Sequence, residues 1–439
     1  MTQTNYIIFF ISFILITLIP LSLVTGPALP DISVVLVCIF FLYYLLKDKQ
    51  FSIFKNLFVY YSFLFWIVLI LLSFNSIEKY NSLGESLIFL RILLIPIIIY
   101  YWLLTKSKFI IFSLFIIFFV NTLVIIDSIY QFLNYDPLIG FKEDIFNRNA
   151  DEFYGRLSGP FLDLVPGSFI SKFFIFGFIF LVLTIKNKKV FFYFSIFYLT
   201  VCGIITFISG ERMALATFLM AIILGVLLLK KYRFIFITSL ICLALISSTI
   251  YFNHDHYQNY RIIESKPSHL GLVIEKYNSK CVNNENCSKI INVQPQFIEV
   301  LKNFSESAYS DTFTLALEMF SSKKITGVGM NSFNYGCLNI EKFKKETCWS
   351  HPHNFYLQWL AETGITGFIF FILYIFIIFK IILFDNKDSA FKYFSIIAII
   401  VLFWPIMSTG SLLKNWHGIQ TFFIIGLSLS VLNIKNRIN

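Results

Sequence analysis

Hydrophobic residues in this chain are gathered into long blocks, and the connections between the blocks carry most of the charged residues. An α-helix rises about 1.5 Å per residue and the hydrocarbon core of a bilayer is about 30 Å thick, so each block can approach or cross the core as a helix. The pattern predicts an all-α polytopic membrane protein with about twelve transmembrane helices. The blocks are residues 6–23, 32–46, 57–74, 83–104, 109–133, 164–185, 190–208, 213–229, 234–252, 365–384, 391–408 and 418–434.

The topology follows from the ends of the blocks. No basic stretch precedes the first block and no small-residue cleavage pattern follows it, so we interpret it as a span rather than a signal peptide. An even number of spans places both termini on one side. Basic residues gather in one alternating set of connections, which marks that set and both termini as cytoplasmic. The set contains Lys47, Lys49, Lys55, Lys106, Lys108, Lys186, Lys188, Lys189, Lys230, Lys231, Arg233, Lys380, Lys387, Lys392, Lys435 and Arg437.

The opposite set contains both long connections, residues 134–163 and roughly 253–363. We expect these loops outside the cytoplasm, in the periplasm of a cell with two membranes. The expected organisation is nine spans with a smaller outer loop in residues 1–252, a large periplasmic loop in 253–364 between spans 9 and 10, and three spans in 365–439.

The large loop is expected to be mainly helical. Apolar residues at near-helical spacing predict a helix over residues 310–321. The stretch G-V-G-M-N-S-F, from Gly327 to Phe333, then forms a tight glycine turn. Such a turn either presents backbone donors or simply reverses the chain.

Four of the seven cysteines lie in the large outer loop, where an oxidising compartment allows two disulfides. Three connectivities are open. We favour Cys281 with Cys287 and Cys337 with Cys348, because both pairs close short loops. A zinc site is the alternative interpretation of the same four residues.

Composition agrees with the block pattern, because 57% of the residues are hydrophobic and only 14% are charged. The 55 Phe and 23 Tyr are interpreted as lipid-facing bulk rather than as a surface for stacking nucleic-acid bases. No P-loop, Rossmann fingerprint or internal repeat occurs, and the net charge of +10 follows the topology. Membrane lipid is therefore an expected partner, and nucleic acid is not.

The stretch S-H-P-H-N-F-Y-L-Q-W-L-A-E-T-G-I-T-G, residues 350–367, concentrates polar groups at the start of a hydrophobic block. Ser350 suits the N-cap and Pro352 the first helical position, so a short helix is predicted over 352–363, ending at Gly364. Its amphipathic pattern favours a position at the membrane surface. One polar line along this helix is formed by Asn354, Gln358 and Glu362.

Histidines provide candidate chemistry on the outer side. His353 titrates near neutrality and can take a proton from a hydroxyl acceptor; the alternative is a polar side chain next to a helix start. A metal site is a further alternative for four of the histidines, but no carboxylate cluster accompanies them. We therefore expect no metal and no cofactor. The six histidines are His254, His256, His269, His351, His353 and His417.

Arginines are the second candidates, because guanidinium groups bind diphosphates in a bidentate manner. Arg212 stands at a block edge and Arg156 in the smaller outer loop, with Arg261 as a third cation beyond the ninth block. The alternative to diphosphate binding by Arg212 is a local pairing with Glu211, or snorkelling of its side chain to the membrane surface. Arg91 lies inside a block, where a charge is costly unless paired; pairing with Glu85 or burial in the bundle is expected.

The motif residues are similar to a known signature. His353 and Asn354, nine residues, Gly364, two residues and Gly367 match that of the O-antigen ligase and polymerase superfamily. Three further stretches stand in the order found in that family. They are G-R-L-S-G-P-F at residues 155–161, I-S-G-E-R-M-A at 208–214 and G-V-G at 327–329.

The resemblance implies a metal-independent glycosyltransferase at the outer face of the inner membrane. Its donor is a glycan on a polyprenyl diphosphate, usually undecaprenyl diphosphate, and its acceptor is a glycan or a lipid core. A chain-length regulator is a further candidate partner. In the family, the motif histidine activates the acceptor and arginines bind the diphosphate. Carried over, His353 is the base and Arg212 and Arg156 bind the leaving group, while Asn354 and Glu362 are further candidates for substrate binding.

Two departures from the family put the second diphosphate ligand in question. Met330, Asn331 and Asn334 stand where relatives often have a basic residue. Asp311 stands in a helix where many members have an arginine, and Arg261 is the candidate substitute.

The H-P-H-N-F-Y-L-Q form of the motif favours an O-antigen polymerase slightly over a ligase. The alternative from another class is a transporter or flippase of lipid-linked oligosaccharide. A transporter is expected to show charged residues in mid-span and repeated halves. Here the polar groups gather in one outer loop, which favours an enzyme.

Overall fold

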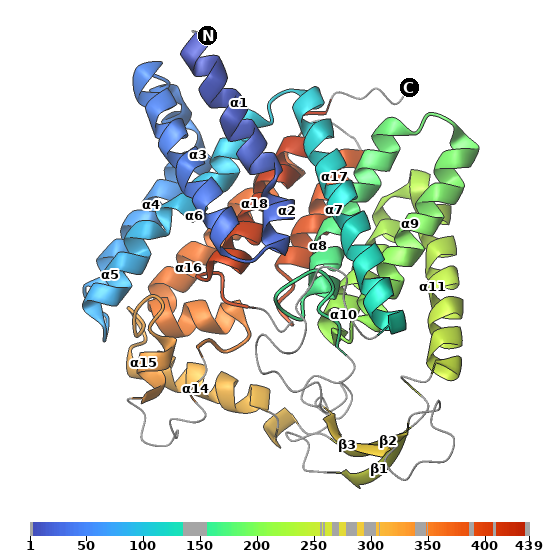
Figure 1. The fold of residues 1–439 in the computed structure, drawn as a ribbon. Coiled ribbons are helices and arrows are strands. Elements are labelled where there is room, and N and C mark those ends of the chain that lie inside the picture. The colour runs from blue at the N-terminus through green and yellow to red at the C-terminus, as the bar shows by residue number, and fades with distance from the viewer. Residues whose placement is uncertain are drawn as a thin grey trace. The chain divides into compact units, whose positions relative to one another are not determined.

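A computed structural model describes residues 3–134, 156–254, 257, 260–265, 272–277, 288–293, 304–306, 308–338, 348, 350–385, 390–406 and 410–434. The chain divides into two compact units, and Figure 1 labels their helices and strands. Unit 1 consists of Met1–Ile117 and Thr312–Asn439, and unit 2 consists of Phe118–Asp311. The long helix α7 (Ser107–Asn134) begins in unit 1 and ends in unit 2.

Unit 1 is a helical bundle built around α18 (Asn415–Val431), whose residues from Gly418 to Val431 are all buried. Helices α6, α17 and α3 pack on it. Helices α5 and α6 continue into the π-helix η2, so that Lys79–Leu103 forms one candidate span. The other elements are α1 (Gln3–Thr17), α2 (Ile19–Val24), α3 (Ala28–Lys47), η1 (Phe51–Lys55), α4 (Leu57–Ser73), α5 (Lys79–Ile88), α6 (Leu90–Ile97), η2 (Ile98–Leu103), α14 (Ala308–Ser322), α15 (Phe333–Leu338), α16 (Phe355–Leu383) and α17 (Ala390–Leu402).

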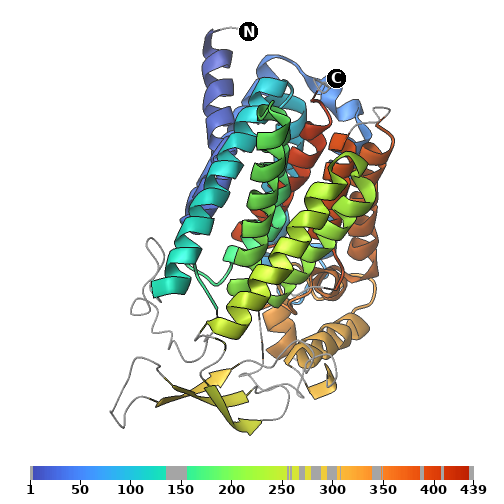
Figure 2. The same ribbon diagram turned by 90° about the vertical axis from the view of Figure 1, so that its right-hand side faces the viewer.

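The hydrophobic helices α8 to α11 of unit 2 alternate in direction along the chain and lie side by side in Figure 2. Helix α9 packs against both α8 and α11, and α10 packs against α8 and α11. Large aromatic residues such as Phe174, Phe178 and Phe236 fill the space between them. The elements are α8 (Pro166–Thr184), α9 (Lys188–Ile208), α10 (Arg212–Leu228), η4 (Lys230–Tyr232), α11 (Arg233–Asn253) and η5 (Phe304–Glu306), with three strands described below.

The structure confirms a predominantly helical chain with candidate membrane spans. Each of the twelve hydrophobic blocks contains at least one helix. Within the described residues, seven helical segments are long and apolar enough to cross a bilayer, and four apolar helices are shorter. The count of twelve spans and the three-part division of the chain stay predictions. The seven are Ala28–Lys47, Lys79–Leu103, Ser107–Asn134, Pro166–Thr184, Lys188–Ile208, Lys230–Asn253 and Phe355–Leu383.

The large loop contains a small sheet that the sequence analysis did not predict. Strands β1 (Tyr260–Ser265), β2 (Leu272–Tyr277) and β3 (Ser288–Val293) form an antiparallel sheet in the order β1-β2-β3. Each strand is short and carries Ile or Val, which favour extended backbone. The predicted helix over 310–321 is confirmed as α14.

The motif helix begins later than predicted. Its N-cap is Asn354, not Ser350, and the first helical residue is Phe355. The reason is the backbone of His353, whose φ of 54° lies in the left-handed region and interrupts a right-handed helix. The predicted end at Gly364 is correct, because Gly364 has φ 63° and breaks α16 into two segments.

Arg91 is paired, but not with the predicted partner. Its Nε lies 3.0 Å from Asp31 Oδ1, and its Nη2 donates to Asn415 Oδ1 at 2.9 Å. Glu85 instead accepts a hydrogen bond from Asn331 Nδ2 at 3.0 Å. The prediction of a Glu85 pair was wrong because Asp31, on α3, lies closer in space than the acidic residue nearer in sequence.

Candidate functional site

In unit 1, His353 stands immediately before the N-cap of α16. Its side chain is half-buried, and its ring packs against that of His351 with 4.4 Å between the ring centroids. Burial lowers the pKa of His353 from its ordinary value of 6.5, because the charged imidazolium is penalised more than the neutral ring. The neutral imidazole that results at neutral pH is the form that accepts a proton.

Asn354 fixes the start of the helix. Its Oδ1 accepts hydrogen bonds from the N–H groups of Tyr356 and Leu357 at 3.0 and 3.1 Å. Its Nδ2 donates to the Pro405 carbonyl at 2.9 Å. The Tyr356 hydroxyl donates nearby to the Phe403 carbonyl at 2.6 Å. Asn354, the residue after His353, is therefore fixed by the two hydrogen bonds of the helix cap and by its hydrogen bond to Pro405, which follows α17.

Glu362 and Gln358 point into the protein, whereas the sequence analysis expected their polar line at a membrane surface. Glu362 is 1% exposed and Gln358 is 3% exposed. Gln358 Nε2 donates to Glu362 Oε2 at 3.3 Å and to Ser411 Oγ at 2.8 Å. The N–H groups of Phe333 and Asn331 donate to the Glu362 carboxylate at 3.1 and 3.2 Å. The polar line is thus an internal network.

The G-V-G turn supplies backbone donors to α16. The N–H groups of Val328 and Gly329 donate to the carbonyls of Ala361 and Glu362 at 3.0 and 2.8 Å. In a regular helix those carbonyls would bind N–H groups four residues on, but the break at Gly364 turns these groups away. In return, the Ile365 N–H donates to the Lys324 carbonyl at 2.8 Å. We call residues 324–333 the glycine clasp.

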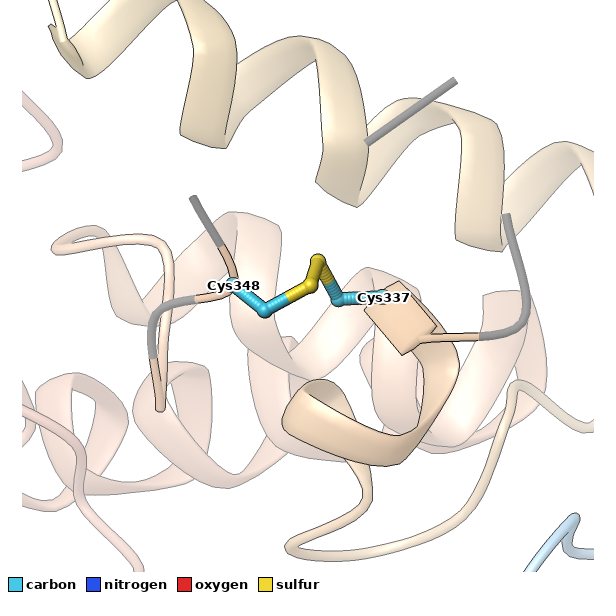
Figure 3. Close-up of a disulfide and its surroundings, with 2 residues drawn as sticks. All are labelled: Cys337 and Cys348. Carbon is cyan, nitrogen blue, oxygen red and sulfur yellow. A yellow bond between two sulfur atoms is a disulfide. The ribbon is translucent and has the colours of Figure 1, made fainter. Parts of the chain in front are cut away.

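The disulfide Cys337–Cys348 lies next to this assembly, and Figure 3 shows it joining the end of α15 to the approach to the motif. Its Cα atoms are 5.6 Å apart. It is one of the two pairings that the sequence analysis favoured. Cys281 and Cys287 lie outside the described residues.

In unit 2, Arg156 lies in a loop that is anchored to α7. Gln131 Oε1 accepts from the N–H groups of Ser158 and Gly159 at 3.0 and 2.8 Å. Arg156 is half-buried, and its Nη2 donates to the Leu164 carbonyl at 3.2 Å. The guanidinium group is therefore held in place by a carbonyl.

Glu211 lies between α9 and α10, and its carboxylate accepts from the N–H groups of Gly167 and Ser168 at 2.6 and 3.1 Å. The residue as a whole is half-buried, but its carboxyl end is enclosed. Burial raises the pKa of Glu211 to about 7, although Arg156, the two N–H groups and Lys172 each lower it. Two cations therefore share the surroundings of one carboxyl group.

The structure places the predicted site residues in two groups, one in each unit. Arg156 and Glu211 are brought together in unit 2, where Arg212 begins α10 with an exposed side chain. Unit 1 holds His353, Asn354 and Glu362 on one helix and its cap. Arg261 lies in β1, and its side chain is outside the described part of the chain.

The remaining histidines are partly described. The His254 ring stacks on Phe132 with 4.3 Å between centroids, and the His417 ring contacts Trp416. His256 and His269 lie outside the described residues. Among the residues that the structure describes, no group of three or more His, Cys, Asp or Glu side chains is placed to hold a metal ion.

Sequence reasoning missed three members of these groups. Lys172 was hidden inside a hydrophobic block, and Ser411 lies in a short connection without any motif. Glu211 was considered only as a local partner of Arg212. A signal for Glu211 and Lys172 was present, because an ionisable residue in or next to an apolar span is costly and marks a functional or paired position.

Comparison with known proteins agrees with the motif resemblance. Residues 194–372 match the family model described as O-Antigen ligase. The match runs from α9 to beyond the break in α16, and so includes Arg212, His353 and Gly367, whereas Arg156 lies before it. No curated protein matches the chain. Residues 194–372 of this multi-pass membrane protein are therefore similar to the O-antigen ligase family, in agreement with the resemblance of its motifs to the O-antigen ligase and polymerase superfamily.

Proposed function

We propose that the protein is an inner-membrane glycosyltransferase that moves a glycan from a polyprenyl diphosphate to a hydroxyl group of its acceptor. The observation that carries this proposal is the environment of His353 within the family motif. The ring is half-buried, its pKa is lowered by burial, and the next residue caps α16. A neutral imidazole on a fixed backbone is suited to general base catalysis.

The reaction has three linked events. His353 accepts the proton of the acceptor hydroxyl while the hydroxyl oxygen forms a bond to the anomeric carbon. The bond from that carbon to the diphosphate oxygen breaks, and the electron pair leaves with the polyprenyl diphosphate. Direct attack inverts the anomeric configuration. The proton on His353 then returns to solvent.

Arginines are assigned to the leaving group. Negative charge grows on the diphosphate as the bond breaks, and guanidinium groups stabilise that charge by paired, charge-assisted hydrogen bonds. Arg156 suits this role because its loop is anchored through Gln131 and its guanidinium group is held by one carbonyl. Arg212 suits it because it is exposed at the start of α10. This chemistry requires no metal ion.

Location follows from the alternation of basic connections. We assign both termini to the cytoplasm and His353 to the periplasmic side, where lipid-linked glycans are polymerised or transferred to a lipid core. Polymerisation is favoured slightly over ligation by the H-P-H-N-F-Y-L-Q form of the motif. The acceptor is accordingly a second lipid-linked glycan, with a lipid core as the ligase alternative.

The test is a profile of surface glycan and lipid-linked glycan in a deletion strain that expresses the wild-type protein, His353→Ala or His254→Ala. His254 is the matched control, a half-buried histidine whose ring stacks on Phe132. Single repeat units in place of long chains identify a polymerase. Long chains that stay on the carrier identify a ligase.

The two histidine variants must both insert and fold, as judged by yield and by size-exclusion behaviour in detergent. We expect His254→Ala to complement the deletion and His353→Ala not to. Full complementation by His353→Ala would remove the base assignment. Normal glycan transfer in the deletion strain would overturn the enzyme proposal and favour a transporter.

Donor binding is tested separately with Arg156→Ala, Arg156→Lys and Arg212→Ala. Loss of a bidentate contact weakens binding of the diphosphate-linked donor. Lysine restores the positive charge but not the planar pair of N–H donors of the guanidinium group. We expect a higher KM for the donor in all three variants, least in Arg156→Lys. Unchanged donor kinetics in Arg212→Ala would leave Arg212 with a structural role.

A further inference from the structure

We infer that Glu362 is a positioning residue for His353, acting at a distance through α15 and the Cys337–Cys348 disulfide. The inference rests on the proposed function, because it concerns the geometry of the proposed base. Glu362 itself is enclosed by protein and contacts neither acceptor nor donor in this assignment.

His353 lies between two anchored points of the chain. Cys348 is five residues before it and bound to Cys337, and Asn354 follows it as the helix cap. The left-handed backbone of His353 is a conformation that residues other than glycine adopt at a cost. Such a backbone persists only where the surrounding structure holds it, so the anchors on both sides matter.

Glu362 holds the other end of the same assembly. One oxygen accepts the N–H of Phe333, the first residue of α15, and the other accepts the N–H of Asn331 in the glycine clasp. Helix α15 ends next to Cys337 and thus leads directly to the disulfide. The disulfide and the Glu362 hydrogen bond therefore close a path through the chain, which we call the motif ring. The motif ring runs through Cys348, His353, α16, Glu362, α15 and Cys337.

The inside of the motif ring is tightly packed. Phe333, Cys337 and Ala361 belong to one buried apolar cluster together with Met319 of α14. Cys348 and Leu357, one on each side of His353 in sequence, pack against this cluster. A shift of α15 would therefore move the chain on both sides of His353 rather than only the clasp.

Two oxygens in the Glu362 side chain are what this position requires. Three donors converge on Glu362, namely two backbone N–H groups and the Gln358 amide. The two oxygens accept from all three, whereas a glutamine has one oxygen and would turn its own NH₂ group toward one of the donors. Glu362→Gln is thus expected to loosen the motif ring locally while the apolar cluster keeps the fold.

The test compares Glu362→Gln with the double variant Cys337→Ser/Cys348→Ser and with all three changes together. Misplacement of a base by about 1 Å lowers turnover by up to about 100-fold, so we expect a 10- to 100-fold lower kcat with little change in donor KM. Because both changes open the same ring, the combined variant should lose little more than the worse of the two. Independent structural roles would multiply the two losses.

Two readouts report on His353 itself. In the loosened ring the His353 imidazole becomes more exposed, so its pKa should rise toward 6.5. The midpoint of the acidic limb of the kcat/KM profile should rise with it. The titratable group that faces His353 is His351. The rate of His353 carbethoxylation by diethyl pyrocarbonate, followed by mass spectrometry, should rise about threefold or more relative to wild type. The second readout needs no catalytic activity.

Matched controls are Glu78→Gln and Cys242→Ser. Glu78 is exposed and lies outside the motif ring and the glycine clasp, and Cys242 is a free cysteine in α11. Both should behave as wild type in every readout. A wild-type pH limb and modification rate in Glu362→Gln, or multiplied losses in the combined variant, would overturn the inference. If His353→Ala were active, the assignment of His353 as the base would fail, while the modification rates would still decide whether the motif ring holds His353.

Discussion

Gly327 and Gly364 lie backbone against backbone. A Cβ atom added to Gly327 would stand 2.5 Å from the Gly364 nitrogen, and one added to Gly364 would stand 2.6 Å from the Gly327 nitrogen. Both residues also have φ values in the left-handed region, 70° and 63°. This contact is what lets the glycine clasp reach the carbonyls at the break in α16, and it explains why glycine stands at position 364 of the motif.

Substitution of either glycine by alanine should therefore be costly. The left-handed backbone and the steric overlap together predict a loss of about 2 to 4 kcal/mol in the free energy of unfolding for Gly364→Ala or Gly327→Ala. Thermal unfolding in detergent measures the effect. Gly84→Ala is the control, because an added Cβ there has no neighbour within 4 Å and alanine favours the helix by about 0.5 to 1 kcal/mol. Equal melting temperatures for Gly84→Ala and Gly364→Ala would contradict the role of the contact.

The activity should depend on pH through His353. A base works in its neutral form, so kcat/KM should rise with pH through the pKa of His353 in the free enzyme. Because burial lowers that pKa, the midpoint of the acidic limb should lie below 6.5. The measurement is a pH profile with a purified lipid-linked donor. A midpoint above 6.5 would assign the limb to another group.

The main role of Asn354 should be that of a helix cap. Asn354→Ala removes the acceptor of two N–H groups and should cost about 1 kcal/mol of stability, whereas Asn354→Asp keeps the acceptor and loses only the bond to the Pro405 carbonyl. Thermal unfolding and steady-state kinetics measured together separate this role from substrate binding. A raised KM in Asn354→Asp at unchanged stability would support the substrate contact.

Asn56→Ala is the matched control for the cap. Asn56 caps α4, where its Oδ1 accepts from the Phe58 N–H at 2.9 Å. The variant should lose a similar amount of stability, about 0.5 to 2 kcal/mol, with no change in turnover. Activity loss in Asn354→Ala beyond that in Asn56→Ala then measures what the cap does for His353.

Glu211 should make stability fall as pH rises toward neutrality. Its pKa is raised from 4.5 to about 7 in the folded protein, so the folded state binds more protons than the unfolded state between these values. The stabilising contribution is complete below pH 4.5 and is lost as pH rises through about 7. Glu211→Gln cannot titrate, so the melting temperature of wild type minus that of the variant should decrease from pH 5 to pH 8. The same difference for Glu78→Gln, an exposed position, should stay flat. An increase with pH would contradict the burial of a protonated carboxyl.

Asp31 should contribute more than Glu85 to the stability of the protein, because Asp31 is the ion-pair partner of Arg91. Asp31→Asn leaves the Arg91 guanidinium without its carboxylate in an apolar helix, and we expect a loss of about 1 to 3 kcal/mol in stability. The pair is partly exposed, with side-chain exposures of 18% and 27%, which keeps the effect below that of a fully buried pair. Glu85→Gln should change the melting temperature little. A larger effect of Glu85→Gln would restore the pairing that the sequence suggested.

Local features of the site were predictable where the local backbone decides them. The break of the motif helix at Gly364 and the helix over 310–321 follow from residue type and spacing alone. The later start of α16 was not predictable, because the residue types around His353 do not indicate its left-handed backbone. The strands of the large loop were missed since short apolar runs fit a helix or a strand equally well.

The sequence by itself determined the helical character of the chain, its apolar spans and its resemblance to a known family. Long apolar blocks must form helices in lipid, because each backbone polar group then finds its partner within the block. Only the tertiary structure decided which polar groups meet: Glu362 with the clasp, Arg91 with Asp31, and Glu211 with the start of α8. Hydrogen bonds and ion pairs act over a few ångströms, so partners that are far apart along the chain are chosen by the packing of helices and not by spacing in the sequence.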